Sequence, residues 1–290
     1  MTNSVFDLSL VICTRNRATQ LAQTLKRVSA MQSRLKWELI VVDNGSTDRT
    51  SAVVAEYAAA CDHPVQMIFE PGRGVSCAKN AGWRSSRSSI IICTDDDCYP
   101  EENYLDSIFE RFSNDAKLGF LGGRILLHDP TDLRITIQES LEPLSFPPGS
   151  FIRPGVIHGA NIAYRRAALT EVGGFDPWFG AGATYSAEEV ELMARISVAG
   201  WNGAYDPRPV VYHHHGRKTA RDEWRLRRWY DWGRGAYYGK CMLNGRMRRV
   251  YLKNWLFARQ HQSWGSTALE IVSGLHYVTR ACMSGRSLNG

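Results

Sequence analysis

The sequence predicts an α/β fold built on a mostly parallel sheet with helices on both faces. Short apolar segments alternate with segments of helical spacing through most of the chain, and the apolar segments are hydrophobic at nearly every position. Strands have this composition when helices cover both sides of a parallel sheet. With 290 residues, 44% of them hydrophobic, the chain is long enough to bury such a core.

Four strands, each followed by a helix, are predicted over the first 112 residues. In the first helix Leu21, Leu25 and Val28 recur at helical spacing. Ser46 or Thr47 is a suitable N-cap for the second helix, which runs to about residue 60. The strands are expected at 8–13, 37–42, 65–69 and 90–94, and the helices at 18–31, 47–60, 75–85 and 101–112.

The second part of the chain is predicted to be less regular. Strands are expected at 118–127, 156–164 and 210–212, and helices at 166–172 and 186–199. The proline-rich stretch 128–156 between them is expected to be a functional loop or an insertion. From Thr219 onward the pattern is helical, and glycines at 233, 235, 239 and 245 are expected to interrupt it.

Cysteine usage and the amino terminus favour a cytoplasmic protein. The seven cysteines are an odd number without a C-x-x-C pair, which is typical of reduced core residues. The amino terminus lacks a basic region followed by an apolar stretch, so no signal peptide is expected. No window approaches 18 apolar residues, so no spanning helix is expected either.

The positive charge is confined to one segment. Residues 216–260 contain 13 Lys and Arg against 3 Asp and Glu, whereas residues 1–215 contain 20 against 25. A nucleic-acid-binding α/β protein is one interpretation of the basic segment. The acidic remainder argues against a broad electrostatic footprint, so no nucleic-acid partner is expected.

Three consecutive carboxylates end the fourth predicted strand. The apolar run 90–93 is followed, after Thr94, by Asp95, Asp96 and Asp97. Because an unpaired buried carboxylate is costly, we expect them just past the strand, at the sheet edge where α/β proteins bind ligands. Their oxygens suit Mg²⁺ or Mn²⁺, and such a cation suits a diphosphate. A solvated turn is the alternative interpretation.

Polar residues follow the other parallel strands in the same way, and the ends of such strands meet at one edge. A nucleotide crevice at this edge is therefore favoured over solvated loops, since cations there can bind phosphate. The residues expected to bind the nucleotide are Thr14, Arg15, Arg17, Asp43, Asn44, Arg73, Lys79, Asp95 and Asp96.

These segments resemble the family 2 glycosyltransferases. The similarity begins with Val-Ile-Cys-Thr-Arg-Asn-Arg at 11–17 and Ile-Val-Val-Asp-Asn-Gly-Ser-Thr-Asp at 40–48, and Asp95–Asp97 resembles the family's metal-binding D-x-D motif. It continues in order through 159–161, 173–176, 188–192 and 213–215 and covers roughly residues 8–216. The resemblance implies a GT-A fold and an inverting hexosyltransferase that uses a nucleotide diphosphate sugar, expected to be UDP-linked.

The resemblance also implies roles for individual donor-site residues. Asp43 contacts uracil or ribose, a role that Asn44 could share, and Asp95 contacts the sugar or ribose. Arg15, Arg73 and Lys79 lie near the base or diphosphate. Asp97 is the chief protein ligand of a Mn²⁺ or Mg²⁺ ion, which stabilises the charge that develops on the departing diphosphate.

The family's catalytic base lies in a Glu-Asp pair at the start of a helix. Here the pair is Glu188-Glu189, and Glu189 is the candidate that takes the proton from the acceptor hydroxyl. Glutamate is one methylene longer than aspartate, so Glu188 could take the role instead. Ser186 and Glu189 also have capping-box spacing, which gives Glu189 a purely structural alternative.

His213, His214 and His215 close the last predicted strand and offer one further metal ligand. Strand alternation places His213 and His215 on one face, and His215 is preferred. Three adjacent histidines do not easily ligate one ion together, which argues against a separate zinc site. On the acceptor side the resemblance places Asn161 and Trp178, although Trp178 could equally pack in the core.

The expected organisation is a catalytic domain at 1–216 and a basic, aromatic-rich helical extension at 217–290. Within the domain a nucleotide-binding half covers about 1–98 and an acceptor half about 99–216. Arg and Trp at helical spacing within 217–260 fit two interpretations, a helix packed on the catalytic domain and a helix in contact with an anionic membrane surface, and the sequence leaves both open. The expected acceptor is a glycan or lipid-linked hydroxyl in polysaccharide biosynthesis at the inner face of the cell membrane. A sugar nucleotidyltransferase remains the alternative enzyme.

Overall fold

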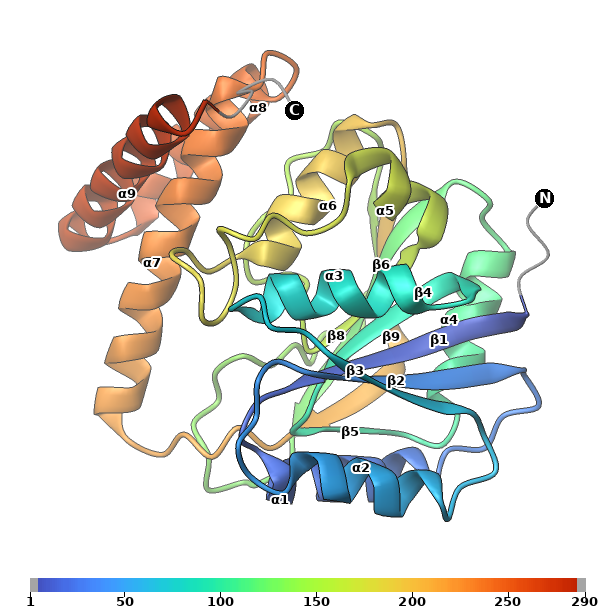
Figure 1. The fold of residues 1–290 in the computed structure, drawn as a ribbon. Coiled ribbons are helices and arrows are strands. Elements are labelled where there is room, and N and C mark those ends of the chain that lie inside the picture. The colour runs from blue at the N-terminus through green and yellow to red at the C-terminus, as the bar shows by residue number, and fades with distance from the viewer. Residues whose placement is uncertain (1–4, 286–290) are drawn as a thin grey trace.

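A mixed sheet with helices on both faces forms the centre of the computed structural model, and a group of long helices lies beside it (Figure 1). The structure describes residues 5–285. The strand order is β3-β2-β1-β4-β8-β6-β9-β5, with β7 paired to β9. The predicted α/β class is confirmed, with parallel pairing concentrated in the first half of the chain.

The first half of the sheet is parallel. Its strands are β1 (Phe6–Thr14), β2 (Trp37–Asp43), β3 (Val65–Phe69) and β4 (Ser88–Asp95), and its helices are α1 (Ala18–Val28), α2 (Thr50–Ala58) and α3 (Val75–Ser85). Thr14 pairs with Asp43, and Cys13 pairs with Asp95. The carboxyl ends of β1, β2 and β4 therefore lie at the same edge of the sheet, as predicted.

The second half of the sheet is mixed. Its strands are β5 (Cys98–Pro100), β6 (Leu118–Leu127), β7 (Leu144–Phe146), β8 (Asn161–Arg165) and β9 (Asn202–His213), and its helices are α4 (Tyr104–Ser113), α5 (Arg166–Val172) and α6 (Glu188–Val198). β8 runs antiparallel to both β4 and β6, while β9 runs parallel to β6. Cys98 of β5 pairs with His213 of β9, which brings the histidines to the aspartate triplet.

Side-chain alternation along the strands divides the core into two layers. Leu10 and Ile12 of β1 pack toward α1 and α4, whereas Val11 packs toward α3, α5 and α6. α1 and α2 accordingly cover one face of the sheet and α3 and α6 the other (Figure 1). The near-continuous apolar composition of the strands follows from this burial on both faces.

Several predicted boundaries differ from the structure. The strand expected at 156–164 begins only at Asn161, and the one expected at 210–212 is the end of the longer β9. The prediction that Ser46 or Thr47 caps α2 is wrong. Ser46 Oγ instead accepts a hydrogen bond from the Asn16 N–H, and α2 begins at Thr50.

The C-terminal region consists of α7 (Ala220–Leu243), α8 (Arg248–Ala258), a 3₁₀ turn (Arg259–His261) and α9 (Trp264–Met283). The predicted interruption of α7 by glycines is wrong, because the helix continues through three of them. A Cβ at Gly235 would lie 2.6 Å from Glu270 Cα, and one at Gly239 would lie 3.0 Å from Gly274 Cα. These glycines allow α7 and α9 to pack backbone against backbone.

Two further expectations concern the oxidation state of the cysteines and the hydropathy of the helices. All seven cysteines are free thiols, three of them buried, as their spacing predicted. Between residues 5 and 285, none of the helices combines the length and the hydropathy needed to cross a membrane.

Candidate functional site

A cleft of about 490 Å³ opens at the carboxyl edge of the parallel strands. It is bounded by the β1–α1 loop, the start of α3, the β4–β5 turn, the start of α6 and the N-terminal half of α7. Most of the predicted site residues meet here. Those that line the cleft are Thr14, Arg15, Arg17, Asn44, Lys79, Asp95, Asp96, Asp97, Glu188, Glu189 and His213.

Arg17 joins two of the three aspartates. Its Nε lies 2.8 Å from Asp96 Oδ1 and its Nη2 donates to Asp97 Oδ2 at 2.5 Å. The Thr14 hydroxyl also donates to Asp96 Oδ2, at 2.7 Å. Burial raises the pKa of Asp96 to about 7, although Arg17 and Thr14 oppose the rise. Asp96 is therefore held by Arg17 and Thr14, and it is absent from the group of potential metal ligands that contains Asp95 and Asp97.

Asp95, Asp97 and His213 form a group that suits a divalent cation. One ligand atom from each of them, and from Cys98, lies within 4.8 Å of the others. Burial raises the pKa of Asp97, but the hydrogen bond and charge of His213, together with Arg17, hold that pKa below its usual value. Two carboxylates and an imidazole fit Mn²⁺ or Mg²⁺.

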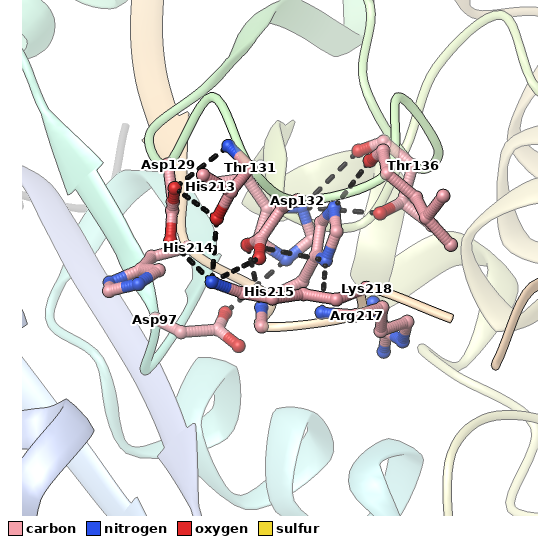
Figure 2. Close-up of polar contacts among 12 residues, drawn as sticks. Asp97, Asp129, Thr131, Asp132, Thr136, His213, His214, His215, Arg217 and Lys218 are labelled. Carbon is pink, nitrogen blue, oxygen red and sulfur yellow. Dashed lines mark hydrogen bonds and ion pairs between the residues drawn. The ribbon is translucent and has the colours of Figure 1, made fainter.

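His213, rather than the preferred His215, lies beside Asp97, with 3.4 Å between His213 Nε2 and Asp97 Oδ1. β9 ends at His213, so strand alternation does not continue to His215. The loop after β6 folds over this point and engages His215, which lies 3.7 Å from Asp132 Oδ2 and 3.0 Å from the Leu133 carbonyl (Figure 2).

The glutamate pair at the start of α6 is partly buried and lies against the buried Lys79. Lys79 Nζ donates to Glu188 Oε1 at 2.9 Å, and the Lys79 side chain is only 3% exposed. Burial raises the pKa of Glu188, but the charge and hydrogen bond of Lys79 outweigh burial and lower it overall. Burial, followed by the neighbouring Glu188 charge, raises the pKa of Glu189 to about 8. One glutamate is thus held as an anion and the other becomes a stronger base.

The alternative capping role of Glu189 does not match the structure. The N-cap of α6 is Ala187, which has a left-handed φ of 75° and makes no side-chain cap. The Ser186 hydroxyl instead donates to the Trp229 carbonyl of α7 at 2.9 Å. Glu189 therefore lines the cleft without the reciprocal bond of a capping box.

Five predicted residues lie outside the lining of the cleft. Asp43 accepts a hydrogen bond from Ser46 N at 2.8 Å and shapes the loop after β2. Asn161 is buried and donates to the Arg124 and Pro209 carbonyls. Trp178 packs on Tyr277 of α9. Arg73 and His215 complete this set.

Four residues from the C-terminal region complete the cleft, and sequence reasoning did not identify them. Arg217 precedes α7, and Leu226, Trp229 and Tyr230 lie on its inner face. Their spacing of three and four residues was a usable signal, because it places them on one side of a helix. The cleft therefore includes part of the segment that the sequence assigned to a separate extension.

The family model described as glycosyl transferase family 2 matches residues 9–173 of the chain. A probable glycosyltransferase, YdaM of Bacillus subtilis, is 27% identical over 241 residues, which cover 80% of this chain and 55% of that protein. The pre-mycofactocin glycosyltransferase of Mycobacterium tuberculosis is 26% identical over 242 residues, which cover 80% and 46%. The chain thus spans about half the length of these curated relatives.

Solved structures give the same fold. The mannosyltransferase PcManGT from Pyrobaculum calidifontis, in complex with GDP-Man and Mn²⁺, superposes with a TM-score of 0.67 at 19% identity and covers 97% of this chain and 76% of that one. Residues 1–349 of S. aureus TarS in complex with UDP give a TM-score of 0.59 at 14% identity, covering 88% and 73%. These likenesses confirm the expected GT-A fold.

Proposed function

The chain belongs to glycosyl transferase family 2, and on this premise we propose that it is a metal-dependent, inverting hexosyltransferase. It transfers the sugar of a nucleotide diphosphate sugar, UDP-linked, to a hydroxyl of a glycan or lipid-linked acceptor. The observation that carries the proposal is the meeting, in one cleft, of the acidic group at Asp95–Asp97 and the paired carboxylates at the start of α6.

The donor binds at the carboxyl edge of the parallel strands. Arg15, Arg17 and Asn44 line the cleft there, and the two arginines offer positive charge to a diphosphate. Asp95, Asp97 and His213 would hold the cation, and Mn²⁺ or Mg²⁺ bound there would supply Lewis-acid stabilisation of the leaving diphosphate. This donor set supports a metal-dependent reaction.

Glu189 acts as the general base. Its carboxylate takes the proton from the acceptor hydroxyl while the acceptor oxygen bonds to the anomeric carbon on the face opposite the diphosphate. The bond from that carbon to the phosphate oxygen breaks, and the nucleoside diphosphate leaves with the electron pair. Lys79 keeps Glu188 anionic, and the Glu188 charge contributes to the raised pKa of Glu189.

A donor screen tests this function. Purified protein is mixed with Mn²⁺ and single nucleotide sugars, and nucleoside diphosphate release and the anomeric configuration of the product are measured. We expect release of a nucleoside diphosphate and inversion at the anomeric carbon. Release of pyrophosphate would instead identify a nucleotidyltransferase, and retention would exclude direct displacement by this route.

We also propose that the C-terminal helices contact the inner face of the cell membrane. Large apolar side chains are exposed along α8 and α9. They are Leu252, Leu256, Phe257, Trp264, Ile271, Val272, Leu275 and Met283. Arg248, Arg249 and Lys253 lie on α8 and form no ion pair with residues 5–285. Apolar and basic side chains together suit the surface of an anionic bilayer.

A further inference from the structure

The cleft does not end at the paired glutamates. A second hollow of about 300 Å³ adjoins it and is lined by Arg217, Asp222, Arg225, Leu226 and Trp229. Three of these, Arg217, Leu226 and Trp229, also line the main cleft. The two hollows therefore share a wall, and a ligand in the first can extend along α7 into the second.

One face of α7 forms this wall. Asp222, Arg225, Leu226, Trp229 and Tyr230 are spaced by three, four, seven and eight residues from the first of them, which places them on one side of a helix. Arg221, Trp224 and Arg228 lie on the same helix but line neither hollow.

Arg217 lies at the junction of the two hollows, and its buried side-chain nitrogen has no partner among the described residues. Its backbone N–H donates to His215 Nδ1 at 3.0 Å, and its carbonyl accepts from Leu133 N at 2.8 Å, so the residue is anchored to the network of Figure 2. Its side-chain Nη1 is buried and has no hydrogen-bond partner among the described residues. A buried, unsatisfied N–H of a cation is costly, and such groups commonly mark a ligand position.

The neighbouring charges leave the second hollow positive. Arg225 is exposed and makes no ion pair with the part of the chain that the structure describes. Asp222 is the acidic residue of this lining, but it accepts hydrogen bonds from the Thr219 backbone N–H and hydroxyl in the α7 capping box. The carboxylates at Asp95–Asp97 and Glu188–Glu189 line the main cleft but not the second hollow.

We propose that the acceptor substrate carries an anionic group, a phosphate ester or a carboxylate, which Arg217 and Arg225 bind next to the accepting sugar. This inference rests on the proposed function, which places the donor diphosphate at the metal group. The anion that Arg217 and Arg225 bind therefore belongs to the acceptor. Trp229 is half-buried and lines both hollows, so it presents an aromatic surface to the sugar ring. Guanidinium groups bind phosphate and carboxylate alike, so the chemistry of the anion is left to the experiment.

The experiment compares Arg217→Gln and Arg225→Gln with Arg221→Gln, a matched control on the same helix that lines neither hollow. First, isothermal titration measures the binding of UDP and GDP with Mn²⁺. With the tighter nucleotide saturating, glucose 1-phosphate, methyl glucuronide and uncharged methyl glucoside are then titrated. If neither nucleotide binds the wild type, the proposed function is contradicted, and the same three probes are titrated without nucleotide.

We expect a charged probe to bind the wild type and uncharged methyl glucoside to bind more weakly. Arg217→Gln should weaken the charged probe about tenfold or more, Arg217→Lys less, and Arg221→Gln not at all. Preference for the phosphate or for the glucuronide identifies the anion. Three results would overturn the inference: loss of nucleotide affinity in Arg217→Gln, equal binding of the uncharged probe, or no binding of either charged probe.

Discussion

At the scale of single residues, the chemistry of the site depends on how three charges share one buried space. Lys79, Glu188 and Glu189 lie together, and the one cation forms its ion pair with Glu188. A pair of identical side chains is thereby given opposite pKa shifts, lowered for Glu188 and raised for Glu189. Environments that separate two neighbouring carboxyl groups in this way are typical of acid–base sites.

The first prediction concerns the catalytic base. Glu189→Gln removes the proton acceptor but keeps the size of the side chain, so turnover should fall by about 10²- to 10⁴-fold while donor binding is retained. Nucleoside diphosphate release and donor titration measure the two effects separately. If Glu188→Gln abolishes turnover and Glu189→Gln does not, Glu188 is the base.

The pH dependence follows from the raised pKa of Glu189. The base must be deprotonated, so kcat/KM should increase as the pH rises through about 8 and level off above it. Below that pH the neutral carboxyl dominates and the rate falls about tenfold per pH unit. A pH–rate profile of the wild type checks this. A kcat/KM that stays constant from about pH 6 to about pH 9, a range around that pKa, would contradict it.

The two histidines provide a matched pair for the metal site. His213→Ala should weaken Mn²⁺-dependent nucleotide binding by about 10- to 100-fold, because His213 lies beside Asp97. His215→Ala should leave that binding unchanged, since His215 contacts Asp132 and Leu133. Mn²⁺ titrations in the presence of nucleotide measure both. The reverse order would restore His215 as the ligand.

At the scale of secondary-structure elements, α7 connects the catalytic cleft to the C-terminal helices. Its N-terminal half lines the cleft, and its C-terminal half packs into the core through Tyr237 and Cys241. Lys240 of α7 pairs with Glu191 of α6 at 2.6 Å and with Asp176 at 2.7 Å. The helix that lines the cleft with its N-terminal half is therefore attached to the helix that carries the glutamate pair.

Gly235 tests the close packing of α7 on α9. In Gly235→Ala the new methyl group would meet the Glu270 backbone, so the free energy of unfolding should fall by about 1–3 kcal/mol despite the better helix propensity of alanine. Gly245→Ala is the control, because nothing lies within 4 Å of a Cβ there. Urea unfolding of both variants measures the difference. Equal stability would show that the two helices are not closely packed.

At the scale of the whole molecule, the C-terminal helices are part of the fold and also expose an apolar surface. Tyr237, Tyr251 and Tyr277, one from each of α7, α8 and α9, belong to the same core cluster as the catalytic domain. The two expectations for this region, packing on the domain and contact with a membrane, are therefore compatible. Packing uses the inner faces of the helices, and membrane contact would use the outer faces.

Flotation with vesicles tests the outer surface. The double variant Phe257→Ser/Trp264→Ser should lose most binding to vesicles containing anionic lipid, because these side chains are 65% and 90% exposed and would enter the bilayer interface. Phe69→Ser is the matched control, since Phe69 is also 65% exposed but lies on the edge strand β3. Equal flotation of the double variant and the wild type would contradict the membrane proposal.

The strands and helices that depend mainly on neighbouring residues in the sequence were predicted well. Strands 65–69 and 118–127 and helices 75–85 and 166–172 agree with the structure at both ends. Apolar periodicity and turn residues determine such segments locally. The three-residue strands β5 and β7 were missed because they are too short to show a period, and they form only where β9 supplies a partner.

The sequence by itself determined the family, the parallel half of the sheet and the gathering of carboxylates at its edge, because each is written in local pattern and order along the chain. Only the tertiary structure decided which side chains meet. It placed His213 rather than His215 beside Asp97, turned the Ser186 hydroxyl toward Trp229 and brought Arg217 into the cleft. The physical reason is that hydrogen bonds and ion pairs depend on distances of a few ångströms between segments far apart in the chain.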